Sequence, residues 1–254
     1  GREMTVFPCK DNWDDILTCI YEAWASGKGH QNIRLELEPV SQQELFCEYI
    51  HIDAEGQKAG KVRSAIRKKI SWQAYQWVYY AAHSARTEKI ECIYRFLILG
   101  FHFGKKITEM LTENTVMQIM ELSRRVTNEE HIMREAARFT CHEGGIYVCH
   151  IEPEHDILLM LAEYFEDRMP SETWMITDDG RRTAVIHPKD QRMYQTVLTE
   201  KEWEQLQETE RIKDIYTTLW NEFFHTIGIR ERENRKCQNT MMPLHYRKHM
   251  TEFM

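Results

Sequence analysis

Residues 90–103 read Ile-Glu-Cys-Ile-Tyr-Arg-Phe-Leu-Ile-Leu-Gly-Phe-His-Phe, the longest near-continuous apolar run in the chain. Only Glu91, Arg95 and His102 interrupt it, so a helix formed here is apolar on most of its sides. The run is shorter than the roughly 20 apolar residues that a membrane span needs. We therefore expect a central, buried helix of a folded domain.

Helical periodicity extends from this run in both directions, over residues 55–139. An apolar stripe with three- and four-residue spacing covers residues 62–70, and an aromatic-rich segment follows over residues 72–79. On the other side, residues 116–126 and 129–139 show the same spacing, which predicts two further helices. The middle of the chain is thus predicted to be a helical bundle.

The first forty residues predict a strand, a helix and a second strand. Thr5-Val6-Phe7 is a short run of β-forming residues, and Asp11 or Asn12 can cap the helix that follows. Residues 33–37 then alternate apolar and charged side chains, which is the period of a half-buried strand.

After residue 139 the pattern changes to short strands and turns. Residues 140–151 predict a hairpin with its turn at 143–145, and residues 173–187 predict another with its turn at 178–180. Each predicted turn contains glycine, which tolerates the positive φ angles of tight hairpin turns.

Two helices and one more strand complete this region. Residues 156–168 predict a helix between the hairpins, and residues 193–198 predict a strand of the same sheet. Thr199 and Glu202 form a capping box, which predicts one long helix ending near Gly228.

The predicted fold class is therefore α+β. A central helical bundle follows a short N-terminal strand-helix-strand unit and precedes a C-terminal region of two hairpins, a long helix and a basic tail. The corresponding domains are residues 1–139 and 140–254, although one compact domain is the alternative because no linker rich in proline, glycine or serine separates them.

Composition excludes several classes of protein. With 42% hydrophobic and 29% charged residues, the 254-residue chain is unlike disordered or fibrous proteins. The seven cysteines include no Cys-x-x-Cys pair, which favours free thiols in a reducing compartment. The first residues lack the apolar segment of a signal peptide, so we expect a cytoplasmic protein that does not bind membranes.

Positive charge is concentrated in two segments of a chain whose net charge is −7. Residues 57–70 hold six basic and no acidic residues, and residues 229–250 hold six basic and two acidic residues. Such local patches are expected where a protein meets phosphates, and an acidic surface of a partner protein would suit them equally well. Within the first segment, Arg63, Arg67 and Lys68 are the predicted phosphate contacts.

The basic tail, residues 234–253, has little regular periodicity but many polar donors, and the aromatic ring of Tyr246 can stack on a base. The predicted nucleic-acid contacts of the tail are Arg235, Lys236, Gln238, Tyr246, Arg247, Lys248 and His249. His245 and His249 are the candidate acid–base residues, should the protein be an enzyme.

Motifs that would identify a common catalytic or cofactor site are missing. Residues 100–106 approximate a phosphate-binding loop but are one residue short and lack the hydroxyl that binds Mg²⁺. The sequence contains no Gly-x-Gly-x-x-Gly, Gly-x-Ser-x-Gly or His-Glu-x-x-His motif. His142 and His150 lie in a hairpin with nearby cysteines, but alternate side chains of a strand point to opposite faces. We therefore predict neither a metal nor a cofactor.

Several segments match a known family. They are residues 5–7 with 20–24, residues 65–70, residues 93–97, and the tail from Lys236-Cys237-Gln238 through Tyr246-Arg247-Lys248-His249 to Phe253. Together they resemble a bacterial family of unknown function described as DNA repair or DNA metabolism proteins. The resemblance covers nearly the whole chain and is most specific in the tail.

The resemblance indicates with which proteins this protein acts, but it implies no catalytic mechanism. Family members look like partners of a radical-SAM protein of DNA modification or repair, and in some longer proteins a similar region is joined to a uracil-DNA glycosylase-like domain. No catalytic residue follows from it. This sequence lacks the Cys-x-x-x-Cys-x-x-Cys motif of radical-SAM enzymes and the cysteine cluster of iron–sulfur glycosylases.

Three hypotheses follow from the sequence. The first is an accessory protein of DNA repair that binds DNA, the radical-SAM protein or both through its basic segments. The second is an enzyme acting on nucleic acid or a nucleotide, with tail histidine and arginine side chains at its site. The third is a structural adaptor for the radical-SAM partner that makes no DNA contact.

Overall fold

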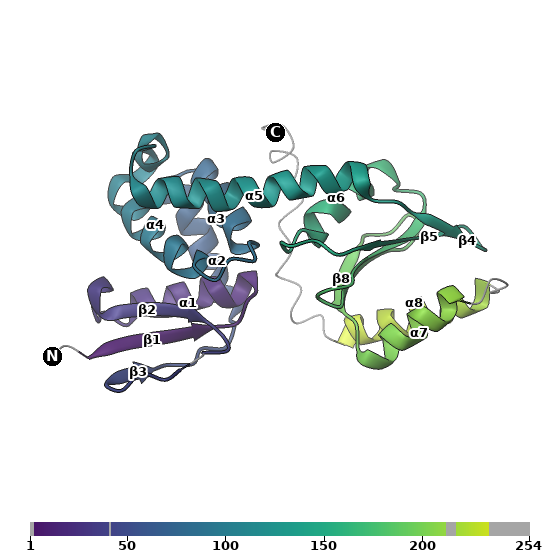
Figure 1. Cartoon of the computed structure of the whole chain (residues 1–254), viewed down its shortest axis with the longest axis horizontal. Helices are drawn as coiled ribbons and strands as arrows, with labels where there is room; N and C mark the ends of the chain where they lie inside the picture. Colours follow the sequence, from purple (N-terminus) through teal and green to yellow (C-terminus); the bar gives the residue numbers. More distant parts are fainter. Residues whose placement is uncertain (1–2, 41, 212–216, 234–254) are drawn as a thin grey trace. The chain divides into compact units, whose positions relative to one another are not determined.

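The computed structural model describes residues 3–40, 42–211 and 217–233. These residues form two compact units, one reaching to Thr127 and the other beginning at Asn128 (Figure 1). The units meet inside one long helix, whereas the sequence placed a domain boundary near residue 140. The fold is α+β, as predicted.

The first unit contains a parallel three-stranded sheet in the order β2-β1-β3. Strand β1 (Met4–Cys9) pairs with β2 (Ile33–Leu37) on one side and with β3 (Cys47–Tyr49) on the other. The predicted strand-helix-strand unit is confirmed. Strand β3 was not predicted, because three residues are too few to establish an alternating pattern.

Helix α1 (Trp13–Ala25) connects β1 to β2, and the short η1 (His30–Asn32) precedes β2. The side chain of Asn12 caps α1 by accepting a hydrogen bond from the backbone N–H of Asp15 at 3.0 Å. The α1 residues Ile16, Leu17 and Ile20 are buried in the core of the unit.

The helical part of the first unit follows the sheet. It comprises α2 (Gly56–Ala65), the π-helical turn η2 (Ile66–Ile70), α3 (Trp72–Ala82), α4 (Lys89–Phe103), the 3₁₀ turn η3 (Gly104–Glu109) and the beginning of α5 (Asn114–Ala136). Helix α4 contains the apolar run and buries Ile93, Phe96 and Leu97 completely. Its Glu91 carboxylate accepts a hydrogen bond from the backbone N–H of Leu35 at 2.8 Å, which covers the edge of the sheet at β2.

The helices predicted over residues 116–126 and 129–139 are one helix, α5 (Figure 1). The intervening Thr127 and Asn128 are weak helix formers, but neither is a glycine or a proline. The hydroxyl of Thr127 bonds to the carbonyl of Ser123 at 3.2 Å within the same helix. The low helix propensity of Thr127 and Asn128 is therefore not enough to end the helix.

The second unit is built on a five-stranded sheet in the order β4-β5-β6-β7-β8. Its strands are β4 (Thr140–His142), β5 (Ile146–Ile151), β6 (Thr173–Asp178), β7 (Thr183–His187) and β8 (Tyr194–Val197). Both predicted hairpins and the fifth strand are confirmed. Strands β5 and β6 are parallel, because α6 (Leu158–Arg168) carries the chain back between them.

Two further helices, α7 (Glu200–Arg211) and α8 (Thr217–Glu233), pack against this sheet (Figure 1). The predicted capping by Thr199 is confirmed, because its hydroxyl accepts a hydrogen bond from the backbone N–H of Glu202 at 3.2 Å. The prediction of one long helix ending at Gly228 is wrong. The chain folds back so that Arg230 reaches Glu202, and α8 continues through Gly228. Periodicity alone does not show such a reversal, since both helices carry an apolar stripe toward the same core.

Within the described ranges, no helix is both long enough and apolar enough to cross a membrane.

Candidate functional site

Some of the basic side chains of the first basic segment, residues 57–70, are already paired with carboxylates. The guanidinium of Arg63 lies 2.7 Å from the carboxylate of Asp14, and the two side chains are only 14% and 10% exposed. Lys58 is paired with Glu22 and Glu55. Arg63, which the sequence offered as a phosphate contact, thus has an acidic partner within its own unit.

Two more basic side chains of this segment lie over aromatic rings. The ammonium of Lys61 is 5.8 Å from the ring centre of Tyr21, and the guanidinium of Arg67 is 5.4 Å from that of Tyr75. Such cation–π contacts hold the stem of the side chain against the protein and leave the charge near the surface. Arg67 is therefore half-buried, whereas Lys68 and the neighbouring Lys69 are exposed.

Lys68 and Lys69 adjoin a second pair of lysines that lies further along the chain. Helix α4 ends at Phe103, and the chain turns into η3 at the next residue, Gly104, whose φ of +63° suits glycine. A Cβ at Gly104 would lie 3.7 Å from the backbone oxygen of Lys69, so η2 and the start of η3 are in contact. The next residues after Gly104 are Lys105 and Lys106, and both are exposed.

We call Lys68, Lys69, Lys105 and Lys106 the lysine surface. None of the four forms an ion pair with any residue in the described part of the chain. Phe103 beside them is 41% exposed, and its ring contacts that of His102 at a centroid distance of 4.7 Å. Unpaired ammonium groups with an exposed aromatic ring are the chemistry by which proteins bind a nucleic-acid backbone and its bases.

The predicted contacts in the tail lie outside the described residues. They are Arg235, Lys236, Gln238, His245, Tyr246, Arg247, Lys248 and His249. Their roles in binding or in acid–base chemistry stay predictions. Arg230, which belongs to the same basic segment, is described and is bound within the second unit, where its guanidinium donates to the carbonyl of Val197 at 2.9 Å.

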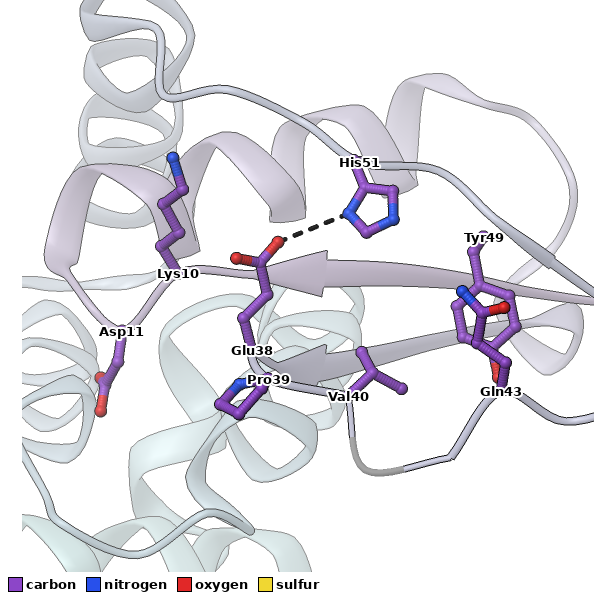
Figure 2. Close-up of a pocket in the computed structure, with 8 residues that line it drawn as sticks. All are labelled: Lys10, Asp11, Glu38, Pro39, Val40, Gln43, Tyr49 and His51. Carbon is purple, nitrogen blue, oxygen red and sulfur yellow. Dashed lines mark hydrogen bonds and ion pairs between the residues drawn. The ribbon is translucent and has the colours of Figure 1, made fainter.

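The first unit also contains an open cavity of about 640 Å³ that was not predicted from the sequence (Figure 2). It lies where the three parallel strands end. Lys10 and Asp11 follow β1, Glu38-Pro39-Val40 follow β2, and His51 comes after β3. In open parallel sheets, ligands bind outside the carboxyl ends of the strands.

The polar groups of this cavity are held in place by neighbours. The Nδ1 atom of His51 lies 3.4 Å from the carboxylate of Glu38. Asp11 receives the ammonium of Lys89 at 2.5 Å, and Lys89 is almost fully buried with two backbone carbonyls as its other partners. The Asp11 charge is thereby compensated from inside the unit.

A separate polar network lies in the second unit around His150. Its Nδ1 atom is 3.0 Å from Asp179 and 2.7 Å from the hydroxyl of Thr177, and its Nε2 atom is 2.8 Å from Glu210. The hydrogen bond with the Glu210 carboxylate is the main reason that the pKa of His150 is raised to about 9. This network joins α7 to the sheet. Neither this network nor any other group of histidine, cysteine, aspartate and glutamate side chains in the described ranges is arranged so that it could hold a metal ion.

Comparison with known proteins gives little functional information. No functionally curated protein matches the chain. A solved DHH-domain structure, described as a member of a family of ribosomal proteins, is similar over 74% of each chain with 8% identity and a TM-score of 0.35. A likeness at this level carries no argument about fold or function.

One family match covers most of the chain. The profile of a domain of unknown function, DUF4130, matches residues 87–252, from the beginning of α4 in the first unit to the tail. Because this match spans well over half of the 254 residues, the chain belongs to the DUF4130 family.

Proposed function

We propose that this protein is an accessory protein of DNA metabolism that contacts DNA through the lysine surface. The observation that carries the proposal is that four lysines without an ion-pair partner in the described residues meet on two adjoining segments, next to an exposed phenylalanine. DNA is the polyanion that the sequence resemblance favours. A role in DNA repair and an interaction with a radical-SAM protein belong to the same proposal.

Electrostatics supports the proposal despite the net charge of −7. At physiological ionic strength, charges more than about 8 Å apart are largely screened, so a local patch decides whether a phosphate is attracted. Lys58 and Arg63 are already paired with carboxylates, so we leave them out of the interface. Lys68 remains part of the proposed DNA interface, together with the other three lysines of the lysine surface.

The test is fluorescence anisotropy of labelled single- and double-stranded DNA oligonucleotides with the full chain over a salt series. Each lysine that contacts a phosphate contributes about one to the slope of log K against log salt. Replacing Lys68 and Lys69 by Gln, or Lys105 and Lys106 by Gln, should therefore lower the slope by roughly one to two.

Lys189→Gln and Lys201→Gln are the matched controls, because both lysines are exposed, belong to the second unit and have no ion-pair partner in the described residues. The controls should keep the wild-type slope. Unchanged slopes in both double variants would remove the lysine surface from the interface. An Arg247→Ala and Lys248→Ala double variant measures the part played by the tail. Absence of DNA binding by the wild-type chain would reject the proposal in favour of a protein adaptor.

A further inference from the structure

The cavity at the end of the parallel sheet differs in chemistry and position from the lysine surface. Its Asp11 is bound by Lys89 at the beginning of α4. The other end of α4 lies near the end of α1, because the rings of Phe101 and Trp24 are 5.3 Å apart. The cavity and the lysine surface are thus at opposite ends of α4, and a ligand of one does not require the other.

The cavity lies where the order of the strands reverses direction. Because β2 and β3 flank β1, the chain leaves β1 toward one side and later returns on the other. Ligand sites of open parallel sheets lie at such reversals, outside the carboxyl ends of the strands. Its volume of about 640 Å³ is in the range of small-molecule sites, which is roughly 300 to 1,000 Å³.

The position of the Glu38 carboxylate indicates which group of the ligand it would bind. It is the first residue after β2, and its backbone N–H donates to the carbonyl of Cys9 at 2.7 Å, which fixes it at the edge of the sheet. Figure 2 shows its carboxylate turned toward His51, which lies beside it. In nucleotide-binding strand-helix-strand units, a carboxylate at this position accepts a hydrogen bond from the ribose hydroxyl.

The turn after β1 argues against a diphosphate. Such units bind phosphates with a glycine-rich turn and the free N–H groups of the following helix. Here the turn is Lys10-Asp11-Asn12, without glycine, and the Asn12 side chain already occupies the N–H of Asp15. Asp14 and Asp15 place acidic side chains in the first turn of α1. A ligand without phosphate fits this turn best.

Apolar surface and one amide complete the cavity. Pro39, Val40, Gln43 and the ring of Tyr49 line it (Figure 2). The hydroxyl of Tyr49 accepts a hydrogen bond from the backbone N–H of Glu44 at 2.8 Å, which holds the ring. An aromatic ring offers a stacking surface for a base, and an amide can both donate to and accept from a base edge.

We propose that this cavity binds a ribonucleoside, with Glu38 accepting a hydrogen bond from the ribose 2′-hydroxyl and Tyr49 in contact with the base. Isothermal titration calorimetry of the full chain with adenosine, guanosine, cytidine and uridine tests it. At least one should bind with a Kd below about 1 mM. The 2′-deoxy form of that nucleoside should bind at least about tenfold more weakly, because it lacks a hydrogen bond to a charged group.

Variants separate the ribose contact from general binding. Glu38→Gln should weaken the ribonucleoside about tenfold and remove the preference for it over the 2′-deoxy form. Tyr49→Phe keeps the ring but loses the hydrogen bond that holds it, so it should retain most of the binding, whereas Tyr49→Ala should bind more weakly than either. Glu143→Gln, in the exposed turn between β4 and β5, is the matched control and should bind normally.

Three results would overturn the proposal. They are no binding of any of the four nucleosides up to about 5 mM, equal affinity of the wild type for the ribo and 2′-deoxy forms, and at least tenfold tighter binding of the 5′-monophosphate. The outcome is independent of the proposed DNA contact, since the Lys68→Gln and Lys69→Gln double variant should keep nucleoside binding and Glu38→Gln should keep oligonucleotide binding.

Discussion

Arg63 and Asp14 form a mostly buried ion pair between α2 and the first turn of α1, with 2.7 Å between donor and acceptor. A pair of this kind contributes little net stability when compared with apolar side chains of the same size. Removing one partner is costly, however, because the other charge is left without compensation in a site that water barely reaches. The pair therefore gives Arg63 a structural role.

Arg63→Ala should lower the free energy of unfolding by roughly 2–4 kcal/mol, measured by urea denaturation. Combining Arg63→Met with Asp14→Leu should recover most of that loss, since no charge then remains unpaired. The folded Arg63→Ala variant should keep the wild-type salt slope for DNA. A smaller slope would instead restore Arg63 as a phosphate contact.

At the scale of elements, the lysine surface depends on how closely η2 approaches α4. A Cβ at Gly100 would lie 2.6 Å from the Cδ1 atom of Ile70, which is buried. Glycine at this position therefore lets the π-helical turn pack directly on α4. The contact positions Lys69 against Gly104, so the two lysine pairs become neighbours.

Gly100→Ala should destabilise the protein by about 1 kcal/mol. The overpacking cost of about 1–3 kcal/mol exceeds the gain of about 1 kcal/mol that alanine brings to a helix interior. Adding Ile70→Val removes the Cδ1 atom and should relieve the clash, so thermal unfolding should show a favourable coupling between the two substitutions. A Gly100→Ala variant as stable as the wild type would show that η2 moves away at no cost.

The His150 network joins α7 to β5 and β6 through Glu210, Asp179 and Thr177. Because the pKa of His150 is raised to about 9 in the folded chain, folding favours the protonated form. The resulting stability is complete below the ordinary pKa of 6.5 and is lost as the pH rises through 9.

Urea denaturation between pH 6 and 9.5 should therefore show stability falling with pH in the wild type. The expected fall is on the order of 1 kcal/mol, because the side chain is one-third exposed and water screens the interaction. His150→Gln cannot gain the proton, so its curve should be flatter over the same range. Parallel curves for the two proteins would assign the pH dependence to other groups.

At the scale of the whole molecule, each unit has its own core. Leu17 is completely buried in the first unit and Met175 in the second, and α5 is shared between the units. Domains with separate cores open locally with separate free energies, even when a helix joins them.

Hydrogen exchange followed by mass spectrometry should resolve this independence. Leu17→Ala should cost about 2–5 kcal/mol and speed up exchange in β1, α1 and β2, while β6 and β7 keep their protection. Met175→Ala should do the reverse. Faster exchange in both units for either variant would indicate a single cooperative unit.

Local patterns made much of the fold predictable. Alternation over residues 33–37, the glycine turn at 143–145 and the caps at Asn12 and Thr199 are signals within a few residues, and the structure confirms each of them. The second predicted hairpin also forms, but its turn lies between Asp178 and Thr183 and has its positive φ at Arg182. Three features were missed: β3, the continuity of α5 and the return of α8 along α7. The pairing of β3 and the return of α8 depend on partners far away in the sequence, which periodicity does not show.

The candidate sites were less predictable than the fold. The sequence marked residues 57–70 as basic, but only the structure shows that Lys58 and Arg63 are paired and that Lys68 and Lys69 adjoin Lys105 and Lys106. Residues 100–106, which only approximate a phosphate-binding loop, could have indicated the lysine surface. Gly100 and Gly104 let η2 pack closely there, and Lys105 and Lys106 are two of its four lysines. Glu38 after a predicted strand was a similar signal for the cavity.

By itself, the sequence determined the α+β class, the apolar centre at α4 and the supply of unevenly distributed charge, since these follow from residue types and their local spacing. The tertiary structure alone decided which charges remain unpaired and which strand ends meet around a cavity. The physical reason is that pairing and cavity formation depend on distances of a few ångströms between residues far apart in the chain, and packing sets those distances.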